Sequence, residues 1–367
     1  MFSYILKRLL LIIPTLFGVI IVNFAIIQAA PGGPVEQAIS RMKGMDSGFS
    51  ERFTSGGKDF SGSNNQQSFF SNNFNTSYRG AQGIDPDIIK RIEKIYGFDK
   101  STGERFFTMV MNFITFKFDK SFYRDKNVIE LIKDKLPVSI SLGLWTTLIT
   151  YLISIPLGIK KAIKDGSSFD VVSSFIIIIG YAIPSFLFAV FLIVMFAGGS
   201  FWQIFPLRGL TSDNFEFLPW YQQIADYLWH IALPVTAMAI GGFASLTMLC
   251  KNSFLEEISK QYVLTARAKG CGERKVLYGH IFRNAMLIVI AGFPSAFVGI
   301  LFTGSFLIEI IFSLDGLGLL SFEATISRDY PLIFGSLFIF TILGLIMNLI
   351  GDIVYMLVDP RIDFEKR

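Results

Sequence analysis

Few residues in this chain have the types and the spacing that enzyme chemistry requires. Its only histidines are His230 and His280 and its only cysteines are Cys250 and Cys271, so neither a paired metal site nor a disulfide framework is indicated. The stretch SGGKD at residues 55–59 lacks the first glycine and the Ser or Thr of a phosphate-binding loop. The motifs H-E-x-x-H and G-x-S-x-G are absent as well. The sequence therefore predicts no catalytic residue, no metal site and no cofactor in this chain.

Acidic residues inside long apolar runs are the next candidates for chemistry. Glu309 lies in GSFLIEIIFSLDGLGLL and Asp352 lies near the end of the last apolar run. A charge within a membrane span is costly, which makes each one a hypothesis for a transport pathway. The alternative is that both side chains snorkel or form pairs near an interface. The candidate pathway or gate residues are Glu309, Asp315, Gly316, Gly318 and Asp352.

A third group is a basic, glycine-containing stretch at residues 251–284, which lies between two apolar runs. Its charges and helical spacing predict a helix that begins near Glu256 and Glu257, a break at Gly270 and Gly272, and a second helix from Glu273. Small residues in the first helix leave room for another backbone, and its basic residues offer charge. Such a surface fits a groove on a partner protein, or else an amphipathic helix on anionic lipid. The candidate contact residues are Tyr262, Thr265, Ala266, Arg267, Ala268, Lys269 and Gly270.

The elements that carry these residues are predicted to be membrane helices. Hydrophobic residues make up 52% of the 367 residues and charged residues 17%. A helix that crosses a bilayer needs roughly 20 apolar residues. Six runs are long enough: Leu6–Ala30, Pro137–Ile159, Val171–Ala197, Trp229–Leu249, Ala285–Phe312 and Leu332–Val358. Pro156, Pro184, Pro234 and Pro294 lie in or at the ends of these runs and favour kinks.

The basic residues predict the orientation of these spans. They flank span one at Lys7 and Arg8, follow span six, and gather between spans two and three and between spans four and five. The loop between spans three and four contains only Arg208 and the loop between spans five and six only Arg328, so both termini are expected in the cytoplasm. The net charge of +4 reflects this topology and does not indicate nucleic-acid binding.

The expected organisation follows from these spans. Residues 1–30 form the first span, residues 31–136 an external loop and helical cap, residues 137–360 a five-helix core with the cytoplasmic loop 251–284, and residues 361–367 a tail. Residues 44–83 are rich in Ser, Gly and Asn and are expected to be a mobile loop. Short helices are expected after Asp85, over ERFFTMVMNFITFKF and over NVIELIKDKL, as either a spacer or a functional lid.

The basic stretch also carries a family resemblance. YVLTARAKG followed by KVLYGHIFRNA resembles the cytoplasmic coupling loop, or EAA loop, of bacterial ABC-importer permeases, with Gly270 at its central glycine. Leu264, Thr265 and Ala266 stand where Glu-Ala-Ala is usual, a departure typical of the dipeptide/oligopeptide branch. Further likeness lies in APGGPVEQAI, LPVSISLG, SIPLGI, GYAIPSF and DPRIDF, so that residues 44–83 alone fall outside it. Within the branch, the chain is most similar to permeases linked to oligopeptide and microcin C-like peptide uptake.

The resemblance implies a fold and a set of partners. The fold would be an all-α membrane protein with six transmembrane helices of the type I importer kind. Partners would be a second homologous permease, ATP-binding cassette ATPase subunits that bind ATP and Mg²⁺, an external peptide-binding protein, the peptide and the lipid bilayer. The setting would be the bacterial inner membrane, which the chain would cross several times. A secondary, ion-coupled transporter and a membrane-embedded enzyme are the alternatives; they predict mid-span charges or clustered His, Asp and Cys residues, which the sequence does not offer.

Overall fold

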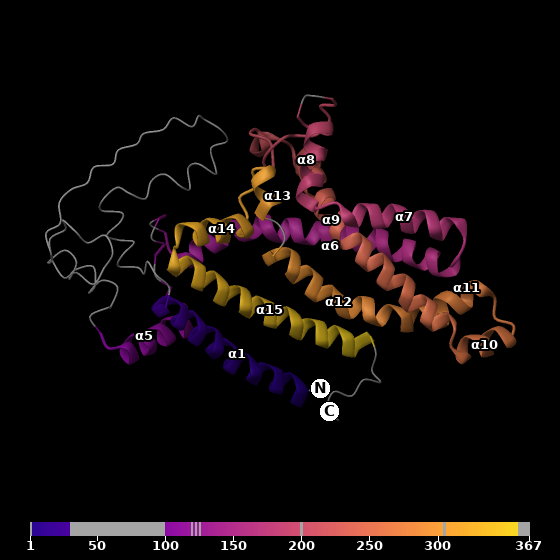
Figure 1. The fold of residues 1–367 in the computed structure, drawn as a ribbon, viewed down its shortest axis with the longest axis horizontal. Helices are drawn as coiled ribbons and strands as arrows, with labels where there is room; N and C mark the ends of the chain where they lie inside the picture. The colour runs from indigo at the N-terminus through magenta and orange to yellow at the C-terminus, as the bar shows by residue number, and fades with distance from the viewer. Residues whose placement is uncertain are drawn as a thin grey trace. The chain divides into compact units, whose positions relative to one another are not determined.

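The computed structural model describes residues 2–29, 100–118, 120–121, 123–124, 126–198, 201–303 and 306–358 (Figure 1). The expected mobile loop at 44–83, the expected helix after Asp85 and the tail at 361–367 lie outside these residues. Within the described part all regular secondary structure is helical, apart from one isolated bridge between Lys120 and Asn127. The chain divides into two compact units: residues 1–10, 132–320 and 340–367 form unit 1, and residues 11–131 and 321–339 form unit 2.

The helices follow the apolar runs closely. The long ones are α1 (Phe2–Ala29), α6 (Val128–Ile163), α9 (Trp220–Ile258), α12 (Phe282–Thr303) and α15 (Tyr330–Val358). The shorter ones are α5 (Thr102–Ile114), α7 (Ser168–Ala182), α8 (Ser185–Phe196), α10 (Gln261–Ala268), α11 (Glu273–Val276), α13 (Phe306–Ile311) and α14 (Leu317–Ser327). A 3-10 turn, η1, covers Phe215–Phe217, and a π-helical turn, η2, covers Leu277–Ile281.

Membrane spans are recognisable by length and composition. Five helical segments of the described chain are long and apolar enough to cross a membrane, and a bent pair, α7 with α8, raises the number to six. The pair turns through 96° at Ile183 and Pro184, where proline cannot continue the backbone hydrogen bonds of α7. The expected all-α membrane fold is thus confirmed, with five or six candidate spans among the described residues. The orientation with both termini in the cytoplasm stays a prediction.

One expected boundary is wrong. NVIELIKDKL is no separate cap helix, because residues 128–135 form the first turns of α6, in which Val128, Leu131 and Ile132 are buried. Their burial favours a continuous helix even though Pro137 removes one backbone donor. For span five the structure describes α12 and α13 on either side of residues 304–305, which lie outside the described part, so the expected run to Phe312 stays a prediction.

Unit 1 holds two apolar clusters. One joins α6, α9, α10, α11 and α12 through buried residues that include Ile159, Phe254 and Val289. The other joins α6, α8, α9 and α13 around Leu142, Ala189 and Phe312. The loop α10–α11 belongs to the first cluster and α13 to the second, and Figure 1 shows them at opposite ends of unit 1.

Unit 2 contains the one expected cap helix that the structure describes. α5 begins with a capping box, in which the Ser101 side chain accepts from the Glu104 amide and the Glu104 carboxylate accepts from the Ser101 amide. Phe106 then contacts Phe17 and Phe24 of α1 edge to face, with ring centroids 6.0 and 5.2 Å apart. This element therefore packs on α1 through aromatic rings.

The π-helical turn η2 joins the basic loop to α12. Phe282 donates its amide hydrogen to the carbonyl of Leu277, five residues earlier, instead of four. One helical turn here contains an extra residue, and Val276 and Ile281 are both buried in the same cluster.

Candidate functional site: the loop between α9 and α12

The basic stretch forms a short helical hairpin. α9 ends at Ile258, Ser259 and Lys260 turn the chain, and α10 begins at Gln261. The expected start near Glu256 is therefore wrong, since Glu256 and Glu257 form the last turn of α9. The expected break at Gly270 and the second helix from Glu273 are both present.

Gly270 supplies the backbone geometry of this turn. Its φ of +78° lies in the left-handed region, where residues with a Cβ are strained. A Cβ built on Gly270 would meet no atom of this chain within 4 Å. The backbone therefore favours glycine at this position, while the space in front of it is open.

The inner face of the hairpin is fixed to the core. Val263 and Val276 are fully buried and Ala266 is nearly so, in one cluster with Phe254 of α9 and Ile159 of α6. Burial of a side chain of this size contributes about 1.5–3 kcal/mol. The loop is thus held to three long helices and does not lie loosely on a surface. Ala266 faces inward. It is therefore not available to a partner, contrary to the expectation from the sequence.

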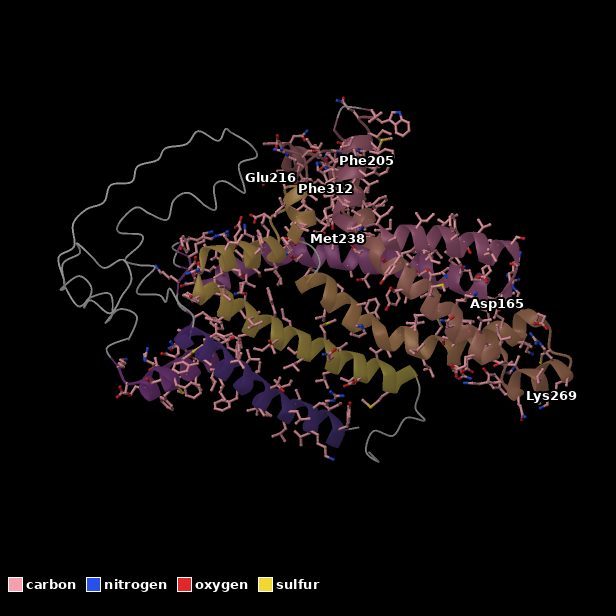
Figure 2. All side chains as sticks on the ribbon, in the orientation of Figure 1. Asp165, Phe205, Glu216, Met238, Lys269 and Phe312 are labelled. Atoms are coloured by element: carbon pink, nitrogen blue, oxygen red, sulfur yellow. The ribbon has the colours of Figure 1, made fainter. Side chains whose placement is uncertain are left out.

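The outer face carries the other candidate contact residues. Five of the candidate contact residues are exposed on this face: Thr265, Arg267, Ala268, Lys269 and Gly270. Arg267 forms a two-point contact with Glu273 across the turn, at 2.9 Å from Nε and 3.0 Å from Nη2. Figure 2 shows Lys269 at the tip of the hairpin, pointing away from the helices. A small, basic, braced surface therefore stands clear of the rest of unit 1.

Tyr262, the seventh candidate, is half-buried and holds the hairpin to α9. Its hydroxyl donates to Oε2 of Glu257 at 2.7 Å, and Lys260 pairs with the other oxygen of that carboxylate. Burial, and then the hydrogen bond to Glu257, raises the pKa of the Tyr262 phenol, and the Glu257 carboxylate raises the pKa of Lys260. The stabilisation from Lys260 is present below its ordinary pKa and is lost only as pH rises through the raised value. This junction is therefore insensitive to pH across the physiological range.

A buried ion network behind the hairpin is absent from the expectations. Lys161 of α6 is 0% exposed, and its ammonium lies 2.9 Å from Oδ1 of Asp170 and 2.8 and 2.7 Å from the hydroxyls of Ser173 and Ser174. Lys251 of α9 lies 2.7 Å from Oδ2 of the same Asp170. The sequence places Lys161 and Lys251 among the basic residues between the spans, and it does not indicate that their side chains are buried. Asp170, an acidic residue in the first turn of α7, was the available signal.

The candidate pathway residues in the GSFLIEIIFSLDGLGLL segment lie together in unit 1. Glu309 of α13 is 0% exposed, and its Oε2 accepts the amide hydrogen of Leu319 at 2.6 Å. Asp315 is exposed and pairs with Lys135 of α6. Gly316 packs directly on the Glu309 carboxylate. Gly318 lies one residue before Leu319 at the start of α14.

Comparison with known proteins assigns the chain to a family. Residues 154–364 match the model of the family described as binding-protein-dependent transport system inner membrane component. The chain belongs to this family. Its matched region includes α9, the hairpin and all five candidate pathway residues. The permease assignment that the coupling-loop motif suggests is thus confirmed.

Full-length relatives agree with this assignment. The permease is 59% identical over 365 residues to the Inner membrane ABC transporter permease protein YejB of Escherichia coli O157:H7, with 100% of both chains covered. It is equally identical to the Peptidoglycan transport system permease protein YejB of Agrobacterium fabrum, covering 100% of this chain and 99% of the relative. The Oligopeptide transport system permease protein AppB of Bacillus subtilis is 33% identical over 369 residues. The motif-level likeness within the peptide branch is therefore to YejB-type permeases.

Family membership fixes several coarser conclusions. The permease is an inner-membrane, multi-pass component of a transport system and not an enzyme. A family that works with a binding protein gives the secondary-transporter alternative no support.

Asp352, the last candidate, is paired at one end of the permease helices. Its Oδ2 accepts from the Tyr4 hydroxyl at 3.0 Å and lies 3.1 Å from Nη2 of Arg8. The pair ties the start of α1 to the end of α15 within unit 1. Asp352 therefore forms a pair near a helix end. This is the alternative to a pathway role that the sequence left open for this residue.

Proposed function

We propose that the chain forms half of the translocation path of an ATP-driven importer of oligopeptides, and that it couples to separate ATPase subunits through the loop at 251–284. The observation that carries this proposal is the two-sided hairpin. Its inner face is packed on α6, α9 and α12, while its outer face is small, basic and exposed. A force applied to the outer face would therefore reach three long helices at once.

The partners follow from what one chain supplies. The sequence offers no phosphate-binding loop, so ATP and Mg²⁺ would be bound by the partner ATPase. With six spans and one coupling loop, the chain would pair with a second, homologous permease to complete the path. An external peptide-binding protein would deliver the cargo, received in part by the cap that contains α5.

The substrate class comes from the relatives. The YejB and AppB proteins are named for peptidoglycan and oligopeptide transport. Peptides, including peptide antibiotics such as microcin C, are the proposed cargo. Cells that lack this chain should become resistant to a microcin C-like peptide and regain sensitivity when the gene is restored; unchanged sensitivity would contradict this part of the proposal.

The coupling role is tested by a side chain on Gly270. Asparagine tolerates the left-handed region better than most residues, so Gly270→Asn adds bulk to the outer face with little backbone strain. We expect the complex in proteoliposomes to assemble, while peptide-stimulated ATP hydrolysis and uptake fall at least about tenfold. Both activities are measured with the second permease, the ATPase and the binding protein present.

Gly166 provides a matched control. It too has a positive φ, +71°, and open space within 4 Å, but it lies in the turn between α6 and α7. Gly166→Asn should keep nearly wild-type activity. Equal, wild-type activity in both variants would refute the coupling role, and equal loss in both would trace the effect to the backbone.

A further inference from the structure

The buried carboxylate of Glu309 is arranged as a cap for the helix that follows it. Leu319, whose amide hydrogen it accepts, is the third residue of α14. The first amides of a helix lack partners within the helix, and the helix dipole favours an anion there. A Cβ added to Gly316 would lie 2.5 Å from Cδ of Glu309, so the carboxylate reaches this place only because residue 316 is glycine.

The segment that Glu309 closes is an elbow, residues 312–316, between α13 and α14. The Leu314 amide donates to the carbonyl of Glu309 at 2.7 Å, and Ser313 has a positive φ of 53°. The segment therefore turns tightly around Glu309, with the side chain and the backbone of this residue both engaged.

The elbow is seated on α6. The amide of Leu317 donates to the hydroxyl of Ser139 at 2.8 Å, and Asp315 pairs with Lys135 one turn away. The Phe312 carbonyl also accepts from the Gly209 amide at 3.0 Å, and Met238 of α9 packs against the apolar cluster that contains Phe312. Backbone and side-chain contacts thus fasten one end of α6 to the elbow.

The other end of α6 is fastened to the hairpin. Ile159 and Ala162 are buried in the cluster that contains Val263 and Val276. Twenty residues separate Ser139 from Ile159 in this helix, a rise of about 30 Å. One helix of unit 1 therefore connects the coupling hairpin to the elbow.

We propose that Glu309 is a positioning residue for transport: it caps α14 and so keeps the elbow seated on α6, which transmits movement of the hairpin to this end of the permease. The inference rests on the proposed coupling function. It assigns Glu309 a role as a hydrogen-bond acceptor rather than as a proton carrier or a ligand of the cargo.

Variants at two positions test this role in the reconstituted complex. Glu309→Leu removes the acceptor, Glu309→Gln keeps an acceptor oxygen without the charge, and Gly316→Ala displaces an intact Glu309. Gly241→Ala is the control, because a Cβ there meets nothing within 4 Å. The readouts are complex assembly, the ratio of peptide-stimulated to basal ATP hydrolysis, and the pH profile of uptake.

We expect Glu309→Leu and Gly316→Ala to lower this ratio at least about fivefold at unchanged basal hydrolysis. Glu309→Gln should stay within about twofold of wild type and keep its pH profile. A wild-type ratio in Glu309→Leu would overturn the inference. So would an inactive Glu309→Gln complex with an altered pH profile, which would place the charge itself on the pathway.

Two further comparisons keep the outcome clear. If Glu309→Leu does not assemble, Gly316→Ala decides, and a wild-type ratio in that variant would overturn the inference. Gly270→Asn in the same preparation separates the two hypotheses: if it is active, the coupling function fails, whereas if it is inactive and Glu309→Leu is active, only the role of Glu309 fails.

Discussion

Lys161 shows at the scale of one residue how a charge can be held inside a membrane protein. The ammonium is out of contact with solvent and is surrounded by the Asp170 carboxylate, the Asp170 carbonyl and two serine hydroxyls. A buried charge is tolerated when it is paired and its hydrogen bonds are satisfied. The network joins α6, α7 and α9 beside the cluster that holds the hairpin.

Removal of the shared carboxylate should therefore be severe. Asp170→Asn leaves Lys161 and Lys251 without their common counter-charge, and breaking such a buried pair costs about 3–5 kcal/mol. We expect a markedly lower Tm of the detergent-solubilised complex, measured by thermal unfolding.

Asp165 is the control for this prediction. It contacts Lys251 at 2.8 Å but its side chain is 52% exposed. Because exposed pairs contribute only about 0–1 kcal/mol, Asp165→Asn should hardly change Tm. Equal effects of the two substitutions would show that burial of the network does not set its strength.

At the scale of elements, α6 and α9 approach closely at Gly158. A Cβ there would lie 2.7 Å from Cβ of Cys250 and 2.9 Å from the carbonyl oxygen of Thr247. Small residues at a helix contact allow this kind of approach, which drives association inside membranes. The contact lies one residue before Ile159, so it also sets how α6 meets the hairpin cluster.

Gly158→Ala should separate these helices. Overpacking of this kind costs about 1–3 kcal/mol, so we expect a lower Tm and weaker coupling of ATP hydrolysis to uptake. Gly18→Ala in α1, where a Cβ meets nothing within 4 Å, should be neutral or slightly stabilising. A Gly158→Ala complex as stable as the Gly18→Ala complex would contradict the close contact.

At the scale of the whole molecule, the orientation in the membrane is open to a direct test. Cys271 in the hairpin is partly exposed and is expected in the cytoplasm, whereas Phe217 is 88% exposed in a loop expected outside. A membrane-impermeant maleimide should label Cys271 only in inside-out vesicles. In a Cys271→Ser background, Phe217→Cys should be labelled from the outer face of the membrane. The reverse pattern would invert the topology.

The extent to which sequence predicts this molecule depends on the range of the interaction. The length of the apolar runs identifies the spans, and Pro184 predicts a kink. The size of the bend between α7 and α8 is known only from the structure. The hairpin is evident from its glycines. The roles of Lys161 and Glu309 are not evident from the sequence, because the Asp170 carboxylate and the Leu319 amide that they contact belong to other helices. The inward position of Ala266 escapes prediction as well, since the junction at Ser259 resets the helical phase.

The extra residue in η2 has a consequence for how this protein can change over generations. Val276 and Ile281 face the same cluster only because five residues make one turn between them. Loss of a single codon there would restore an ordinary helix and swing the hairpin by roughly 100° around the axis of α12. Point substitutions can change the side chains of the outer face without changing its direction. An insertion or deletion in η2 would rotate the outer face to another direction. Homologous permeases should therefore differ in composition along this segment while its length remains constant.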